Sequence, residues 1–324
     1  MATYLITGVA GFIGSALARA LLDRGEQVRG LDNFSTGHRE NISTIASRLD
    51  FREGDLLDLG ALHQACRGVD YVLHQAAIPS VPRSVKDPLE SNQANLNGTL
   101  NVLMAARDAK VKRVVYAASS SAYGDTPTLP KHEDMSPQPI SPYAVAKLAS
   151  EFYMQSFYSV YGLETVSLRY FNIFGPRQDP NSPYSGVLAR FITMMLQDET
   201  PTIFGDGEQS RDFTYVDNAV EANLLACKAR AAEAAGRVFN VATGERITLN
   251  QAAAALKKII GYKGNIKYEA ERTGDIRHSL GDISQAAKHL GYQPKVNFEQ
   301  GLERTVAWYR EQTKTQATNT AASS

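Results

Sequence analysis

The feature that most constrains this 324-residue chain is a glycine-rich turn between its first apolar run and its first helical pattern. The run TYLIT leads into TGVAGFIG, and the helical segment SALARALLDRG follows. Gly8, Gly11 and Gly14 let the backbone approach a pyrophosphate, and the start of a helix adds N–H donors and a favourable dipole. This order predicts a dinucleotide-binding turn, to which we also assign Phe12 and Ile13.

The alternation of strand and helix continues along the chain. The apolar runs VRGLD, VDYVLHQAA, VKRVVYAASS and TVSLRYFN are separated by segments of helical length. This pattern predicts an α/β fold with a Rossmann-type, doubly wound parallel sheet. After Asn172 the sequence becomes loop-rich. We therefore predict a cofactor domain over residues 1–175, to which segments near 214–243 return, and a smaller, mainly substrate-binding domain over 176–312. The polar segment 313–324 is predicted to be a disordered tail.

Composition narrows the range of partners. Lys plus Arg and Asp plus Glu both number 34, so no global basic field indicates nucleic acid or a membrane surface. No apolar run approaches the ~18 residues of a membrane span, and the N-terminus lacks the features of a signal peptide. We expect a cytoplasmic protein. Cys66 and Cys227 lie in no metal or redox spacing, so free thiols and no metal site are expected.

The second apolar run ends on a residue that selects the cofactor. Asp32 closes this run in GLDNFSTG, where a carboxylate accepts hydrogen bonds from a ribose 2′-hydroxyl. The same carboxylate would repel a 2′-phosphate, so the sequence favours NAD over NADP. The loop that follows is assigned to the same site, at Asn33, Ser35, Thr36 and Gly37.

The stretch SPYAVAK predicts a helix that carries a reactive pair. Ser141 is a suitable N-cap and Pro142 suits the first helical position. Tyr143 and Lys147 then lie on one face, one turn apart. A phenol ionises near pH ~10, but a neighbouring ammonium favours the phenolate and makes the tyrosine a usable base. By itself the motif is also compatible with an ordinary surface helix.

Taken together, these motifs make the chain resemble the extended short-chain dehydrogenase/reductase family over residues 1 to about 312. TGVAGFIG, GDLLD, HQAA, NLNGT, SSSAYG and YAVAK occur in the family's order. The resemblance implies that further residues border the cofactor: Asp55 and Leu56 at the adenine, Gln75, Ala76 and Ala77 along the cleft, Asn95 at a helix start, and Tyr170 near the nicotinamide.

The resemblance also implies a catalytic group of Ser119, Tyr143 and Lys147. Tyr143 would take a hydroxyl proton while the carbon gives hydride to NAD, and Ser119 would bond the oxygen. Three consecutive serines leave the register open, and Ser120 and Ser121 are assigned to the substrate. Dehydratases of this family carry an Asp-Glu pair where these two serines stand. Return of the hydride to the opposite face, which is epimerisation, is therefore favoured over dehydration.

The second half most closely resembles the nucleotide-sugar epimerases. The residues that this implies for the UDP-sugar are Asn172, Gln178, Arg211, Arg272, Asp275 and Ser279. Ser279 stands where glucose-restricted bacterial epimerases carry a tyrosine, so we expect conversion of UDP-N-acetylglucosamine to UDP-N-acetylgalactosamine, with weaker or comparable activity on UDP-glucose and UDP-galactose. The alternatives are a UDP-glucose 4-epimerase only, a UDP-uronic acid epimerase or decarboxylase, a C6 dehydrogenase, and a non-enzymatic NAD-binding regulator. Family members commonly form homodimers.

Overall fold

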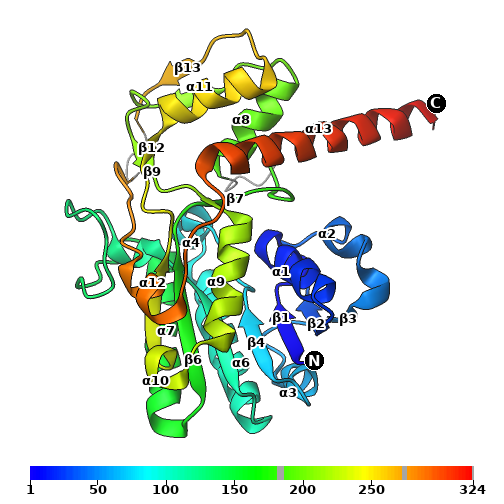
Figure 1. Ribbon diagram of the computed structural model, residues 1–324, viewed down its shortest axis with the longest axis vertical. Coiled ribbons are helices and arrows are strands. Elements are labelled where there is room, and N and C mark those ends of the chain that lie inside the picture. The colour runs from blue at the N-terminus through cyan, green and yellow to red at the C-terminus, as the bar shows by residue number, and fades with distance from the viewer. Residues whose placement is uncertain (181–185, 272–275, 323–324) are drawn as a thin grey trace.

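A single parallel sheet forms the centre of the protein (Figure 1). The computed structural model describes residues 1–180, 186–271 and 276–322. The strand order is β11–β6–β5–β4–β1–β2–β3, and every neighbouring pair is parallel. The strands are β1 (Thr3–Thr7), β2 (Gln27–Asp32), β3 (Asp50–Glu53), β4 (Tyr71–His74), β5 (Arg113–Ser119), β6 (Glu164–Tyr170) and β11 (Arg237–Val241). The predicted Rossmann-type doubly wound fold is confirmed.

Helices cover both faces of this sheet. The face packed by α1 (Phe12–Asp23) also carries α9 (Val216–Lys228), and α12 (Ser284–Leu290) packs against β11. The opposite face carries α3 (Leu59–Cys66), α6 (Gly98–Asp108) and α7 (Pro142–Tyr161). Shorter elements connect these helices: α2 (Glu40–Ser43), η1 (Ala46–Arg48), α4 (Val81–Lys86), α5 (Pro88–Asn92), the π-helical turn η2 (Gln93–Asn97), η3 (Ser120–Tyr123) and α10 (Ala231–Ala234).

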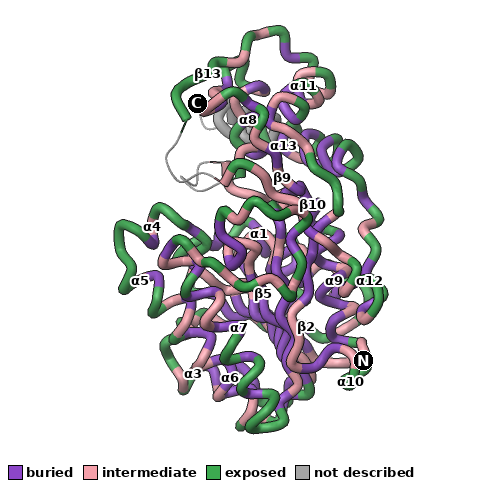
Figure 2. Tube along the Cα trace, turned by 90° about the vertical axis from the view of Figure 1, so that its left-hand side faces the viewer, coloured by how far each residue is buried: buried purple, intermediate pink, exposed green. Residues whose placement is uncertain are grey.

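The strands have apolar side chains on both sides because both faces of the sheet are buried (Figure 2). In β1, Tyr4 and Ile6 belong to the core beneath α1 and α9, whereas Leu5 belongs to the core beneath α3, α6 and α7. Successive side chains of a strand point to opposite faces. Continuous apolar runs, rather than alternating ones, are therefore what this sheet requires.

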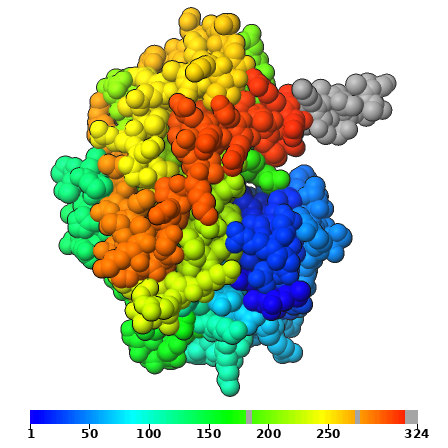
Figure 3. All heavy atoms as spheres, in the orientation of Figure 1, coloured from blue at the N-terminus to red at the C-terminus, as the bar shows by residue number. Residues whose placement is uncertain are grey.

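A smaller part lies above the carboxyl ends of the strands (Figures 1 and 3). It contains α8 (Val187–Leu196), α11 (Leu249–Ile260) and α13 (Phe298–Ala322), with three short strand pairs. The pairs are β7 (Ile173–Phe174) with β10 (Thr214–Tyr215), β9 (Ser210–Arg211) with β12 (Ile247–Thr248), and β8 (Thr202–Phe204) with β13 (Lys267–Glu269). A separate apolar core joins these elements.

The chain passes between the two parts more than once. After β10 it returns to the central sheet as α9 and then β11, which pairs with β6. Helix α13 extends to Ala322, into the segment 313–324, for which disorder in solution stays a prediction. Within the described residues, no helix is long and apolar enough to cross a membrane. Cys66 and Cys227 are buried free thiols.

Candidate active site

The glycine turn adopts a conformation that only glycine can form without a clash. Gly8 has a φ of +70°, and a Cβ there would lie 2.7 Å from the Ala76 Cα. A Cβ on Gly14 would lie 2.0 Å from the Gly8 carbonyl oxygen. Helix α1 begins at Phe12 directly after this turn, and its N-cap, Gly11, supplies no side-chain hydrogen bond. The N–H groups of the first helical turn therefore have no side-chain cap and remain suited to a phosphate.

Asp32 lies beside this turn at the carboxyl end of β2. One carboxylate oxygen accepts a hydrogen bond from the Ala10 N–H at 2.8 Å, and the other accepts one from the Phe34 N–H at 2.8 Å. Burial raises the pKa of Asp32, and the backbone bonds oppose that rise. Each oxygen keeps a second lone pair for a ribose hydroxyl. The uncapped helix start and this carboxylate together fit a dinucleotide whose ribose carries a free 2′-hydroxyl.

The loops after β2 and β3 contain residues predicted to border the cofactor, with Asp55 and Leu56 at the adenine. The Asn33 side-chain amide donates to the Asp55 carboxylate at 2.7 Å, which joins the loops after β2 and β3. Leu56 is half-buried and its backbone carbonyl accepts a bond from Asn101. Ser35 and Thr36 are exposed, and Gly37 is buried against Ala10.

A hydrogen-bonded group holds the residues expected near the nicotinamide. Tyr170, at the end of β6, donates its hydroxyl to the Gln75 amide oxygen at 3.2 Å and accepts from Asn223 at 2.6 Å. The Gln75 amide nitrogen in turn donates to Asn223 at 3.1 Å. Ala76 and Ala77 follow Gln75 in the loop after β4 and are half-buried. Sequence reasoning missed Asn223, because it comes from α9 and no local motif marks it.

Asn95 lies in the π-helical turn η2 and holds the loop that follows β4 by hydrogen bonds to Ile78. Its amide oxygen accepts the Ile78 N–H at 2.8 Å, and its amide nitrogen donates to the Ile78 carbonyl at 3.2 Å and to Ser91. These bonds occupy the side chain within the protein. A π-helical turn at this place is consistent with a functional region, where such turns are frequent.

The predicted catalytic residues come together at the carboxyl ends of β5 and β6. Ser119 ends β5, and its hydroxyl forms a hydrogen bond with Tyr143. The Ser121 hydroxyl donates to Ser119 at 2.8 Å, and Ser120 begins the turn η3. Ser119 is thus the one of the three serines that the structure pairs with the phenol. Helix α7 is capped by Ser141, whose hydroxyl accepts the Ala144 N–H, and it places Lys147 one turn beyond Tyr143.

The pKa values of Tyr143 and Lys147 differ from those that the spacing in SPYAVAK predicts. Burial raises the pKa of Tyr143 to about 12, although the bond to Ser119 opposes the rise. Burial lowers the pKa of Lys147 to about 7, against the pull of the Glu151 carboxylate. The Lys147 ammonium donates to the Ala117 carbonyl at 2.8 Å. Desolvation therefore favours the neutral forms of both side chains.

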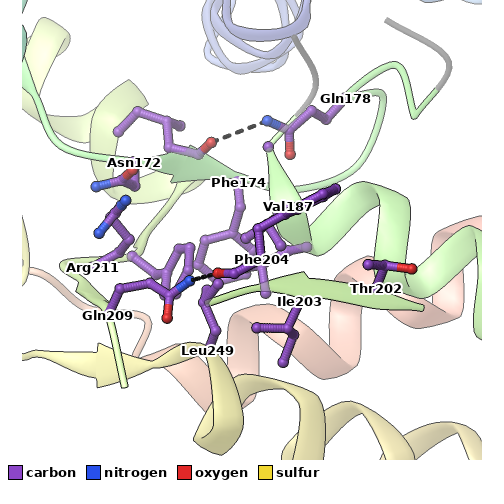
Figure 4. Close-up of a pocket in the computed structure, with 14 residues that line it drawn as sticks. Asn172, Phe174, Gln178, Val187, Thr202, Ile203, Phe204, Gln209, Arg211 and Leu249 are labelled. Atoms are coloured by element: carbon purple, nitrogen blue, oxygen red, sulfur yellow. Dashed lines mark hydrogen bonds between the residues drawn. The ribbon is translucent and has the colours of Figure 1, made fainter. Parts of the chain in front are cut away.

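Three predicted substrate residues line a pocket of about 220 Å³ in the smaller part (Figure 4). In the view of Figure 4, Asn172 and Arg211 lie toward the same end of the pocket, and Gln178 lies above them. The Gln178 amide donates to the Ile173 carbonyl at 3.3 Å, and the Arg211 guanidinium donates to the Ser210 carbonyl at 2.9 Å. The remaining lining residues include Phe174, Val187, Thr202, Ile203, Phe204 and Leu249. Sequence reasoning missed these residues, most of which are apolar, because nothing distinguishes them locally from core positions.

Ser279 lies close to this pocket without lining it. Its N–H donates to the Ser210 carbonyl at 3.0 Å, which sets the segment 277–279 alongside β9 and therefore beside Arg211. The preceding residue, His278, bonds the Ser210 hydroxyl at 2.8 Å. Arg272 and Asp275 lie outside the described residues.

The sheet, the uncapped helix start and the Ser119–Tyr143–Lys147 group define a Rossmann-fold enzyme that binds a nicotinamide dinucleotide. The chain belongs to the NAD dependent epimerase/dehydratase family, which matches residues 4–242. The predicted membership of the extended short-chain dehydrogenase/reductases and the predicted cofactor, NAD, are confirmed.

Its relatives include several UDP-sugar 4-epimerases and also a UDP-N-acetyl-alpha-D-glucosaminuronate decarboxylase of Bacillus cytotoxicus, which is 33% identical over 95% of this chain and 97% of the relative. A putative UDP-glucose 4-epimerase of Methanocaldococcus jannaschii is 35% identical, covering 96% of this chain and 99% of the relative. The solved UDP-glucose 4-epimerase of Thermotoga maritima is 39% identical, with a TM-score of 0.91 and coverage of 96% and 99%. The UDP-N-acetylglucosamine 4-epimerase of Methanobrevibacter ruminantium is 40% identical, with the same TM-score and coverage.

Proposed function

We propose that this protein interconverts the C4 epimers of a UDP-hexose, and that UDP-N-acetylglucosamine and UDP-N-acetylgalactosamine are its preferred pair. The observation that carries the proposal is that Ser119 and Tyr143 meet at the carboxyl edge of the sheet, the edge that also carries the glycine turn. The smaller part above this edge contains the pocket lined by Arg211, Asn172 and Gln178. A planar guanidinium suits a diphosphate. The pocket has the polar and apolar groups that a nucleotide needs.

Each residue has a distinct task in this reaction. Bound NAD supplies the hydride acceptor and donor. Tyr143 takes the proton of the sugar 4-hydroxyl and returns it after the sugar has presented its other face. Ser119, already bonded to Tyr143, holds the same oxygen, and Lys147 supplies positive charge one helical turn beyond Tyr143. Tyr170, Gln75 and Asn223 fix one another and so give the cleft a rigid wall.

Overall identity does not distinguish the N-acetylated from the plain substrate, since solved relatives of both kinds are similar to this chain at 39% and 40%. We base the preference on Ser279. A small side chain beside the strand of Arg211 leaves room for an acetamido group at C2, whereas a bulky ring would exclude that group and spare a hydroxyl.

Ser279→Tyr tests this preference. The parent is expected to act on both UDP-N-acetylhexosamines and on UDP-glucose and UDP-galactose, and the variant to lose the N-acetylated pair selectively. Ser279→Ala serves as the matched control and should keep the parent ratio of the two activities. If Ser279→Tyr also kept that ratio, Ser279 would not be the gate.

Incubation of the purified protein with UDP-sugars separates the alternative functions. An epimerase redistributes a pair of C4 epimers without net NADH, a C6 dehydrogenase accumulates NADH, and a decarboxylase acting on a UDP-uronic acid releases CO₂. A UDP-glucose-only epimerase redistributes only the plain pair, and a regulator produces no change. Accumulation of NADH or CO₂ as the main product would overturn the proposed reaction.

Retention of the cofactor is a second test. Epimerisation returns NAD to its starting state, so the cofactor need not leave, and mass analysis of the denatured protein should find NAD. Asp32→Ala removes the acceptor beside the glycine turn and should reduce the retained amount. NADP as the sole retained nucleotide would contradict the assignment of Asp32.

We further propose that the protein acts as a homodimer. Exposed apolar side chains lie on α4, α5 and α7, which contact one another, at Val85, Leu89, Val145 and Phe152. Leu89 is 75% exposed and Phe152 is 56% exposed. Clustered exposed apolar groups of this kind are typical of an association surface. A cytoplasmic location stays a prediction.

A further inference from the structure

Helix α7 carries a third ionisable side chain in line with Tyr143 and Lys147. Glu151 follows Lys147 by one turn, so the three residues share one face of the helix. Lys147 is 3% exposed and Glu151 is 1% exposed. A charged carboxylate this deeply buried is rare unless it has a partner.

Arg169 of β6 is that partner. Its Nε donates to the Glu151 Oε1 at 3.0 Å and its Nη2 donates to Oε2 at 2.7 Å, which is a bidentate ion pair. Arg169 is 4% exposed, and its guanidinium lies 4.7 Å from the centre of the Tyr123 ring. Apolar residues in place of a buried ion pair are often equally stable or more stable. Stability alone therefore gives no reason for this pair to lie here.

The surroundings of Lys147 indicate what the pair does. The Lys147 ammonium lies 4.7 Å from the centre of the ring of Tyr116, a residue of β5. His74 approaches from β4 and is neutral, because burial and the charge of Lys147 lower its pKa to about 3. The ionisable groups that face this region are His74 of β4, Tyr116 of β5, Tyr143 and Glu151 of α7 and, through Glu151, Arg169 of β6. Of these groups, Glu151 is the one whose negative charge favours the ammonium.

We propose that Glu151, held by Arg169, is a positioning residue that keeps Lys147 in its ammonium form beside Tyr143. Burial raises the pKa of Glu151, and the ion pair with Arg169 opposes that rise and so favours the charged carboxylate. The two hydrogen bonds from Arg169 also hold the carboxylate in one orientation. This inference rests on the proposed function, because the charge of Lys147 matters to the reaction only if Tyr143 is its base.

The test compares Glu151→Gln with the parent, using the protein with the nucleotide it retains on purification. Without the carboxylate, Lys147 loses its proton at lower pH and no longer favours the phenolate. Tyr143 should therefore ionise at higher pH, and the pH optimum of turnover should move upward. If the pKa of Tyr143 rises by one unit, the fraction of phenolate at any pH well below that pKa falls about tenfold. The phenolate of Tyr143 is followed by its ultraviolet absorbance, after subtraction of the Tyr143→Phe spectrum.

Three further variants protect the test against a simple folding defect. Glu151→Leu with Arg169→Met removes both charges, leaves no buried ion unpaired, and should show the same upward shift. Glu151→Asp keeps the charge and should keep the parent midpoint. Glu164→Gln is the matched control, since Glu164 pairs with the buried Arg113 at 2.6 Å at the other end of β5 and β6. It should alter thermal stability without moving the midpoint.

The outcomes are distinct. The inference is overturned if the ionisation midpoint of Tyr143 stays unchanged in both charge-removing variants while circular dichroism shows that each variant is folded. Glu151 and Arg169 would then form a purely structural pair. A shifted midpoint in a protein that epimerises no UDP-sugar would support the inference about Lys147 and refute the proposed reaction.

Discussion

At the scale of single residues, burial decides the chemistry of this site. Tyr143 and Lys147 have the spacing of a base and its supporting cation, yet burial moves the pKa of Tyr143 to about 12 and that of Lys147 to about 7. Both shifts favour the neutral forms. In the proposed reaction, the phenolate therefore needs positive charge in addition to that of Lys147, and the nicotinamide ring of bound NAD would supply it.

Tyr143→Phe is predicted to lower the turnover number by ~10²–10⁴ while the affinity for the UDP-sugar stays close to that of the parent. The variant removes the proton acceptor and leaves the ring in place. Steady-state kinetics and calorimetric titration with UDP measure the two effects. Tyr153→Phe, on the exposed side of the same helix, is the control and should behave as the parent. Parental turnover in Tyr143→Phe would remove this residue from the mechanism.

At the scale of elements, the first strand–turn–helix unit is held together by backbone contacts closer than any side chain permits. Gly8 carries the left-handed φ, and Gly14 packs its α-carbon against the Gly8 carbonyl. The end of β2 joins the unit through the bond from the Ala10 N–H to Asp32. Contacts within the protein backbone and the Asp32 side chain therefore define the shape of the turn.

Gly14→Ala is predicted to destabilise the protein by about 1–3 kcal/mol, the usual cost of overpacking, and to reduce the amount of retained NAD. The added Cβ would lie 2.0 Å from a backbone oxygen that cannot move without reshaping the turn. Chemical denaturation and nucleotide analysis measure the two changes. Gly60→Ala, near the start of α3, is the control. Its Cβ meets only the flexible Asp58 side chain, at 3.2 Å, so any loss of stability should be smaller than in Gly14→Ala, and no loss of NAD is expected.

At the scale of the whole molecule, buried polar groups join elements that are distant in the chain. His74 is wholly buried in the sheet, and its two ring nitrogens bond the hydroxyls of Thr7 at 2.7 Å and Thr99 at 2.9 Å. Thr99 donates onward to the Asn95 carbonyl at 2.6 Å. The chain of bonds runs from β1 through β4 to α6, and it requires a neutral imidazole.

His74 predicts a loss of stability in acid. Its pKa is about 3 in the folded protein and 6.5 as the ordinary value, so the unfolded chain binds the extra proton first as the pH falls. The stabilising contribution is fully present above pH 6.5 and is lost progressively between pH 6.5 and about 3. In His74→Gln, the unfolding free energy should fall less steeply over this range, as measured by urea denaturation at several pH values. Equal slopes in both proteins would contradict the prediction.

The proposed association surface makes a prediction at the same scale. Val145→Glu combined with Phe152→Glu places charges on the exposed face of α7 and should convert a dimer into a monomer, as measured by light scattering after size-exclusion chromatography. Val160→Glu adds a charge to an exposed apolar site near the other end of the same helix and is the control. If the parent protein is itself monomeric in this measurement, the dimer proposal is refuted.

Short-range signals in the sequence were sufficient for the fold and for much of the site. The order of strand, glycine turn and helix predicts the parallel sheet, and the Ser141–Pro142 pair predicts where α7 begins. Asp32 is identified by its place at a strand end. These signals act over one turn of helix or one strand, and here the tertiary structure agrees with them.

Only the tertiary structure decided which side chains meet across elements. The sequence gives no means of pairing Glu151 with Arg169, or Asn223 with Tyr170, because the order of strands in the sheet brings them together. The pocket likewise combines residues near 172–178 with Arg211 and Leu249, which the return of the chain to the smaller part assembles. The pKa values of Tyr143 and Lys147 belong to this level too, since they depend on desolvation. Desolvation is a property of the packed molecule, and a motif of seven residues cannot specify it.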